Sequence, residues 1–144
     1  MTTVVVSEEE LDTLVSIAIR RAEFLEDSGL PGARQAWLEV MAYETRLAKL
    51  TRPADVTGGV ARVGAVRAAL AAGDRLAAQN LATQYLAEDS LPDERRTAIR
   101  RAFDEAMERL AQRFPVLAKT GRLAELQQWR SAVSDNTAVF PRAA

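Results

Sequence analysis

The chain has 144 residues, of which 48% are hydrophobic and 27% charged, and its formal net charge is -1. This balance is typical of one globular domain, and it excludes both a disordered chain and a strongly basic nucleic-acid-binding protein. Cysteine and histidine are absent, which excludes disulfides, thiolate nucleophiles, the usual zinc sites and Ser-His-Asp triads. Any chemistry would have to use carboxylates, Lys, Arg, Tyr, Ser or Thr, and we expect neither a cofactor nor an enzyme.

The sequence predicts neither a signal peptide nor a membrane-spanning helix. The start, MTTVVVSEEE, has no basic segment ahead of its short apolar run. No stretch approaches the roughly 20 apolar residues that a spanning helix needs. The bias toward arginine and alanine is typical of GC-rich bacterial genomes. We therefore expect a cytoplasmic bacterial protein that binds neither a membrane nor nucleic acid.

The first predicted helix begins with a capping signal. Ser7 followed three residues later by Glu10 is a capping box, and Val6 and Leu11 occupy the two positions of a hydrophobic staple. This helix is expected to run to about Asp27, where a Ser-Gly pair stops it.

The apolar arc of this first helix is wider than one packing contact requires. Its main stripe consists of Leu11, Leu14, Val15, Ala18, Ala22 and Leu25. Ile17, Ile19 and Phe24 lie beyond the two edges of that stripe. The simpler explanation is that the helix packs between two neighbours in the same chain. The alternative is that these three residues contribute to an interface with another subunit.

The second predicted helix, residues 33–50, carries the carboxylate of Glu44 inside its apolar stripe. A carboxylate in such a position must be paired, protonated or close to an edge. Glu44 could act as a general acid or base with a raised pKa. An ion pair with Arg62 or Arg67 of the next helix is the more economical interpretation. We take Glu44, Arg62 and Arg67 as a candidate buried ion pair or ligand pocket.

A break at residues 51–59, marked by a proline and by Gly58-Gly59, precedes the helix that we place at the centre of the fold, residues 60–72. This helix is apolar nearly all round, as buried helices are. Its aliphatic side is expected to pack on the second or the fifth helix. Its other side is expected to meet the fourth or the first helix and holds only small residues: Ala61, Gly64, Ala65, Ala68 and Ala72.

The central helix is expected to end at Gly73, and Asp74 is expected to cap a fourth helix over residues 75–88. This hairpin resembles a tetratricopeptide repeat, which favours Gly, Asp and Ala at the positions of Gly73, Asp74 and Ala78. The aromatic and Leu-Gly positions of that repeat are missing here, and no second copy occurs at a period of about 34 residues. We interpret the segment as a helical hairpin of the same kind and not as a member of that family.

Ser90 predicts the cap of a fifth helix that runs to about Phe114. Its arginines spread around the helix and are followed by acids, which favours a solvated, self-paired face over a nucleic-acid patch. A sixth helix is expected over residues 122–133. We expect one α-helical domain over residues 1–144, with loose ends at 1–6 and 135–144.

Together these elements predict an all-α fold, a compact bundle of five to six mostly antiparallel helices around residues 60–72. Because no catalytic motif is present, we interpret the chain as a non-catalytic protein-interaction module. It would be a small adaptor or accessory subunit of a bacterial multi-component system, acting with a protein partner or as a homo-oligomer. One alternative is a small-ligand-binding regulatory bundle. The other is a carboxylate-dependent enzyme, which would need a second acid or a metal near Glu44.

Overall fold

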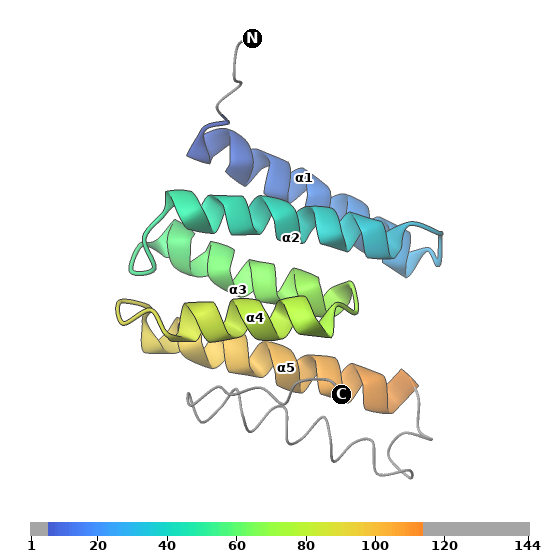
Figure 1. The fold of residues 1–144 in the computed structure, drawn as a ribbon. Coiled ribbons are helices and arrows are strands. Elements are labelled where there is room, and N and C mark those ends of the chain that lie inside the picture. The colour runs from blue at the N-terminus through green and yellow to red at the C-terminus, as the bar shows by residue number, and fades with distance from the viewer. Residues whose placement is uncertain (1–5, 114–144) are drawn as a thin grey trace.

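The computed structural model describes residues 6–113, which form five helices: α1 (Glu8–Asp27), α2 (Ala33–Leu50), α3 (Val56–Ala71), α4 (Arg75–Leu86) and α5 (Asp93–Arg113). Figure 1 shows each helix running antiparallel to the next, and both α4 and α5 pack against α3. The expectation of an all-α helical bundle is confirmed over these residues. The predicted helix at 122–133, the loose end expected at 135–144 and all but Val6 of the loose end expected at 1–6 lie outside the described residues. Within residues 6–113, none of the helices is both long and apolar enough to cross a membrane.

The start of α1 follows the capping signal in the sequence. The Ser7 side chain accepts a hydrogen bond from the backbone N–H of Glu10 (3.1 Å), which satisfies one of the free donors at the helix start. Val6 is half-buried and packs against the core cluster that contains Leu11. The helix therefore begins where the cap and the apolar contact together hold the chain.

The turn between α3 and α4 also follows its sequence signal. Gly73 has a φ of +74°, a left-handed conformation that side chains disfavour, and it closes the C-terminal end of α3. The Asp74 side chain then accepts a hydrogen bond from the backbone N–H of Ala77 (3.1 Å). These two residues reverse the chain within a single turn.

The start of α3 differs from the prediction, because the helix begins at Val56 and includes the Gly58-Gly59 pair. The backbone N–H of Gly59 donates to the carbonyl oxygen of Asp55 (2.8 Å), so the pair continues the helix and does not interrupt it. A Cβ on Gly58 would lie 1.9 Å from the carbonyl oxygen of Arg52. Glycine is needed at this position because the preceding loop folds directly over it.

The connection between α4 and α5 also differs from the prediction. The fourth helix ends at Leu86, and the fifth begins at Asp93, beyond the Ser90 that the sequence suggested as its cap. The guanidinium of Arg96 donates hydrogen bonds to three backbone carbonyls in this region, those of Leu86, Glu88 and Leu91. The arginine therefore supplies a donor to the carbonyl of the last residue of α4 and to two carbonyls of the connection that follows it.

The central position of α3 is confirmed, since α3 packs against α2, α4 and α5. Nine of its sixteen residues are buried. At Gly64 the small-residue face meets Glu44 of α2, so the prediction that this face meets the fourth or the first helix is wrong there, although the cluster around Ala68 includes residues of α1. Ala68 of the same face belongs to a core cluster with buried residues of α1 and α2: Ala18, Ala22, Ala36 and Val40. Small side chains suit this position because they let the α2 backbone approach closely.

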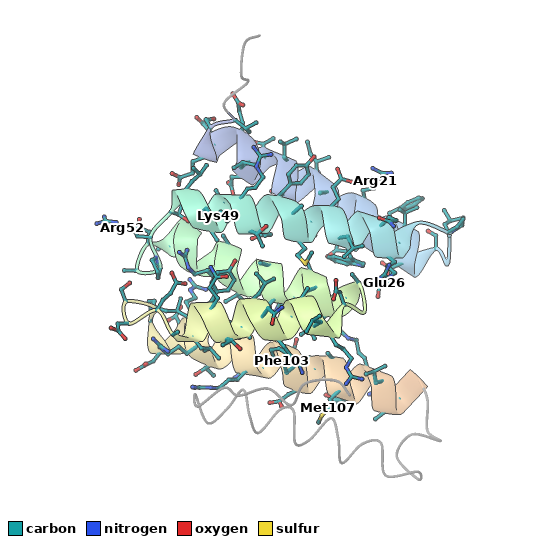
Figure 2. All side chains as sticks on the ribbon, viewed as in Figure 1. Arg21, Glu26, Lys49, Arg52, Phe103 and Met107 are labelled. Atoms are coloured by element: carbon teal, nitrogen blue, oxygen red, sulfur yellow. The ribbon has the colours of Figure 1, made fainter. Side chains whose placement is uncertain are left out.

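Large apolar side chains from several helices fill the rest of the core. Phe103 of α5, labelled in Figure 2, is 1% exposed. The other largest side chains with almost no exposure are Leu11, Val40, Val66 and Ile99, from α1, α2, α3 and α5. One continuous set of contacts therefore connects the stack from its first helix to its last described helix.

We predict that Gly58→Ala destabilises the protein, although alanine is the better helix former by about 1 kcal/mol. The added Cβ collides with the Arg52 carbonyl, and the forced shift should lower the free energy of unfolding by roughly 1–3 kcal/mol. Urea unfolding followed by circular dichroism measures the change. Ala42→Gly, at an exposed position of α2, calibrates the propensity effect alone. A Gly58→Ala variant as stable as wild type would contradict the close approach of the Arg52 carbonyl to Gly58.

Candidate functional site

Glu44 is an acid enclosed by apolar neighbours at the contact between α2 and α3. Its position on α2 is set by the helical spacing that also buries Val40 and Leu47. The residue is 4% exposed. A Cβ on Gly64 of α3 would lie 2.6 Å from Oε2 of Glu44 and 2.9 Å from Oε1, so the absence of a side chain at Gly64 makes the room for the carboxyl group.

The Glu44 carboxyl group is not stabilised as an anion. Its Oε2 is buried and has no hydrogen-bond partner. Burial is the larger cause that raises the pKa of Glu44, to about 8, and repulsion from the charge of Asp12 on α1 raises it further. Glu44 is therefore mainly neutral at pH 7. A neutral carboxyl group can be buried at much lower free-energy cost than a carboxylate without a partner.

The ion pair predicted between Glu44 and Arg62 does not form. Nε of Arg62 donates to Oε1 of Glu88 at 2.7 Å, and Nη2 donates to Oε2 of the same carboxylate at 3.1 Å. This bidentate geometry is the strongest arrangement for an arginine and a carboxylate. Arg62 is buried, whereas the Glu88 side chain is 28% exposed. Arg67, the other predicted partner, is exposed.

Arg62 also binds backbone and aromatic groups around it. Nη1 donates to the carbonyl oxygen of Gly58 (2.9 Å) in its own helix, and Nη2 donates to that of Thr51 (3.2 Å) at the end of α2. The guanidinium carbon lies 5.5 Å from the ring centre of Tyr85 on α4, within the range of a cation–π contact. Burial is the main cause that raises the pKa of Tyr85, to about 12. Arg62 thus connects α2, α3, α4 and the segment that follows α4.

The sequence identified Glu44 and Arg62 as polar side chains of the interior, and both are buried. It missed Glu88, which it placed at the last turn of the fourth helix, and it missed Asp12. Glu88 lies 26 residues from Arg62, and no local spacing rule connects positions so far apart. The signal that could have suggested Glu88 is its place directly after an apolar helix, opposite the central helix in the Gly73-Asp74 hairpin.

The candidate interface residues on α1 have different environments. Ile17 is 54% exposed and Phe24 is 62% exposed. Ile19 is half-buried and packs against both core clusters. Ile19 therefore belongs to the interior, as the simpler explanation of the wide apolar arc required, whereas Ile17 and Phe24 face solvent.

Within residues 6–113, no group of three or more Asp or Glu side chains converges as a metal site would require. Comparisons with models of protein families, with curated proteins and with solved structures found no match to the chain. The function must therefore be argued from the chain's own residues. Those residues are the satisfied arginine Arg62, the unpartnered acid Glu44 and the apolar pair Ile17 and Phe24.

We predict that Arg62→Ala lowers the free energy of unfolding by roughly 2–4 kcal/mol, because it leaves Glu88 and two backbone carbonyls without their donor. Arg67→Ala removes the same charge from an exposed position of the same helix and should change that free energy by less than about 0.5 kcal/mol. Urea unfolding at pH 7 measures both variants. Equal effects of the two substitutions would show that the buried contacts of Arg62 do not stabilise the fold.

We also predict energetic coupling between Gly64 and Glu44. Gly64→Ala should lower the free energy of unfolding by roughly 1–3 kcal/mol, because the new Cβ occupies the space of the Glu44 carboxyl group. In a Glu44→Ala background that space is empty, so the added cost should be smaller by about 1 kcal/mol or more. A double-mutant cycle measures the coupling, and additive effects would place the two residues apart.

Proposed function

We propose that the chain is a non-catalytic protein-interaction module, a small adaptor or accessory subunit of a bacterial multi-component system, and that α1 carries its binding face. The proposal is supported mainly by Ile17 and Phe24. They are large apolar side chains seven residues apart, or two helical turns, so they lie on the same side of α1. Aromatic side chains are among the residues that contribute most to binding when a partner buries them.

The position of α1 in the stack supports this choice of face. The helix is the first of the stack and packs against α2 (Figure 1). Its buried residues, Leu11, Val15, Ala18 and Ala22, form the opposite stripe. Arg20 and Arg21 lie beside the exposed pair and are themselves exposed, which would give a partner a polar rim around two apolar anchors.

Most of the other exposed apolar side chains support a binding face less well, because they lie at or near a helix end or in a loop. Val60 of α3 has only Val56, the first residue of that helix, as an exposed large apolar neighbour one turn away. Leu50 is the last residue of α2, Val56 the first of α3 and Leu76 the second of α4, while Leu30 lies between α1 and α2. Single apolar residues at such positions are common on protein surfaces. Ile17 and Phe24 instead lie within a continuous helix that has one long open side.

A second candidate function, a small-ligand-binding regulatory bundle, is favoured by one observation. Oε2 of Glu44 is buried and unpartnered, so a ligand with a hydrogen-bond donor would satisfy it. Arg62 no longer supports this candidate, because its donors are occupied by Glu88 and by backbone carbonyls. The interaction module therefore remains the better supported proposal.

We predict that Ile17→Ser combined with Phe24→Ser weakens association at least tenfold, because each buried anchor contributes about 1 kcal/mol or more. Sedimentation equilibrium measures self-association, and affinity purification with quantitative mass spectrometry measures partner binding. Leu76→Ser is the matched control, since Leu76 is 66% exposed but lies on α4. All variants should unfold at the wild-type temperature. The proposal fails if the wild-type chain is monomeric and retains no partner, or if Leu76→Ser has the same effect.

A further inference from the structure

The contact between the α1–α2 hairpin and the rest of the described chain runs along α2 and α3, and we call it the α2–α3 seam. Hydrogen bonds hold its two ends. At the loop end, Nη2 of Arg62 donates to the carbonyl oxygen of Thr51 (3.2 Å). At the far end, Nε of Arg34 donates to the carbonyl oxygen of Ala72 (3.2 Å). Between these ends lies Glu44, with its carboxyl group directly over the backbone of α3.

Within residues 6–113, no positive charge compensates a Glu44 carboxylate in the seam. Gly64, which the carboxyl group faces, contributes no side chain. Arg62 is buried nearby, but its Nε and Nη2 are bound to Glu88. The remaining basic side chains of α2 and α3 are exposed to solvent: Arg34, Arg46, Lys49 and Arg67.

The groups that face Glu44 from α1 and α4 do not compensate the charge either. Asp12 of α1 is an acid, and its charge raises the pKa of Glu44 in addition to the larger effect of burial. Burial raises the pKa of Tyr85 of α4 to about 12, and the negative charge of an ionised Glu44 adds to this increase. Tyr85 is therefore neutral in the pH range where Glu44 titrates. Loss of the Glu44 proton places an uncompensated negative charge between two helices.

We propose that Glu44 makes the α2–α3 seam a joint controlled by a proton. While the carboxyl group is neutral, the α1–α2 hairpin stays docked on α3. When the group ionises, the hairpin moves away from α3 and the carboxylate reaches water. The loop between α2 and α3 acts as the pivot, because Arg62 holds Thr51 there, and the contact between Arg34 and Ala72 breaks.

The direction of the pH effect follows from the protons bound in each state. In the closed seam Glu44 keeps its proton up to about pH 8, whereas in the open seam a solvated glutamate loses it near its usual pKa of about 4.3. Between these values the open state binds one proton fewer. The equilibrium constant for opening therefore rises about tenfold for each pH unit over this interval, and it becomes constant above about pH 8.

Hydrogen exchange followed by mass spectrometry tests the joint in the full chain. Measurements from pH 5 to pH 9 are corrected for the intrinsic pH dependence of amide exchange. An undocked hairpin would keep the contact between α1 and α2 but lose the packing of α2 on α3, and its amides should exchange faster because tertiary packing supplies most of the stability of helices in proteins. We expect the opening constant of amides in α1 and α2 to rise about tenfold per pH unit up to about pH 8, with no such rise in α5.

Two substitutions connect the effect to Glu44. Glu44→Gln keeps the size of the side chain but cannot ionise, so the pH dependence in α1 and α2 should disappear. Asp12→Asn leaves the interior intact and removes the charge that repels a Glu44 carboxylate. The opening constant should therefore stop rising at a lower pH than in the wild type. Glu23→Gln, at an exposed acid of α1, should behave as wild type.

Several results would overturn the proposal that ionisation of Glu44 opens the α2–α3 seam. Equal pH dependence of exchange from α1 to α5 would show that only the whole chain unfolds. A pH dependence that persists in Glu44→Gln would assign the proton to another group. A wild-type protein whose corrected exchange does not vary with pH would show that the seam does not respond to ionisation. None of these results depends on whether Ile17 and Phe24 bind a partner.

Discussion

The close approach of α2 to the small-residue face of α3 is the constraint on which the other features depend. Gly64 leaves space for a carboxyl group that any larger residue would displace. Gly58 lets the chain after α2 fold over the first turn of α3, which brings the Thr51 carbonyl within reach of Arg62. Gly58, which looks like a helix breaker in the sequence, and Gly64, which the sequence placed on the small-residue face, thus both permit a close helix contact in the structure. Their cost in helix propensity is offset by the packing they allow.

Within residues 6–113, the interior contains one acid and one base, Glu44 and Arg62, that are accommodated in opposite ways. The charge of Arg62 is compensated by Glu88, two backbone carbonyls and the Tyr85 ring, which surround the guanidinium. Glu44 has no comparable partners, so the carboxyl group retains its proton. A buried charge without compensation is costly, whereas a proton removes the charge entirely. The protonation state of Glu44 therefore depends on the pH of the solution, whereas the charge of Arg62 is balanced by its neighbours.

Local signals predicted the parts of the fold that local interactions determine. Ser7, Gly73 and Asp74 are caps or turn residues that act within three or four positions, and each has the predicted role. The burial of Glu44 follows from helical spacing alone, so it was also predictable. The partner of Arg62 was not, because Glu88 reaches it only after the α3–α4 turn has reversed the chain. The same holds for Arg96, which looks like one member of a solvated basic face until the carbonyls at the end of α4 are placed beside it.

The contacts of Arg62 have a consequence for where the chain can be lengthened. The guanidinium binds Thr51 before the α2–α3 loop and Glu88 in the α4–α5 connection, and both connections lie at the same end of the stack (Figure 1). Extra residues at that end would separate groups that one side chain must bridge. The turn at residues 28–32 lies at the opposite end, and its Leu30 and Pro31 are exposed. A tag, a reporter or an inserted domain is therefore best accommodated in that turn.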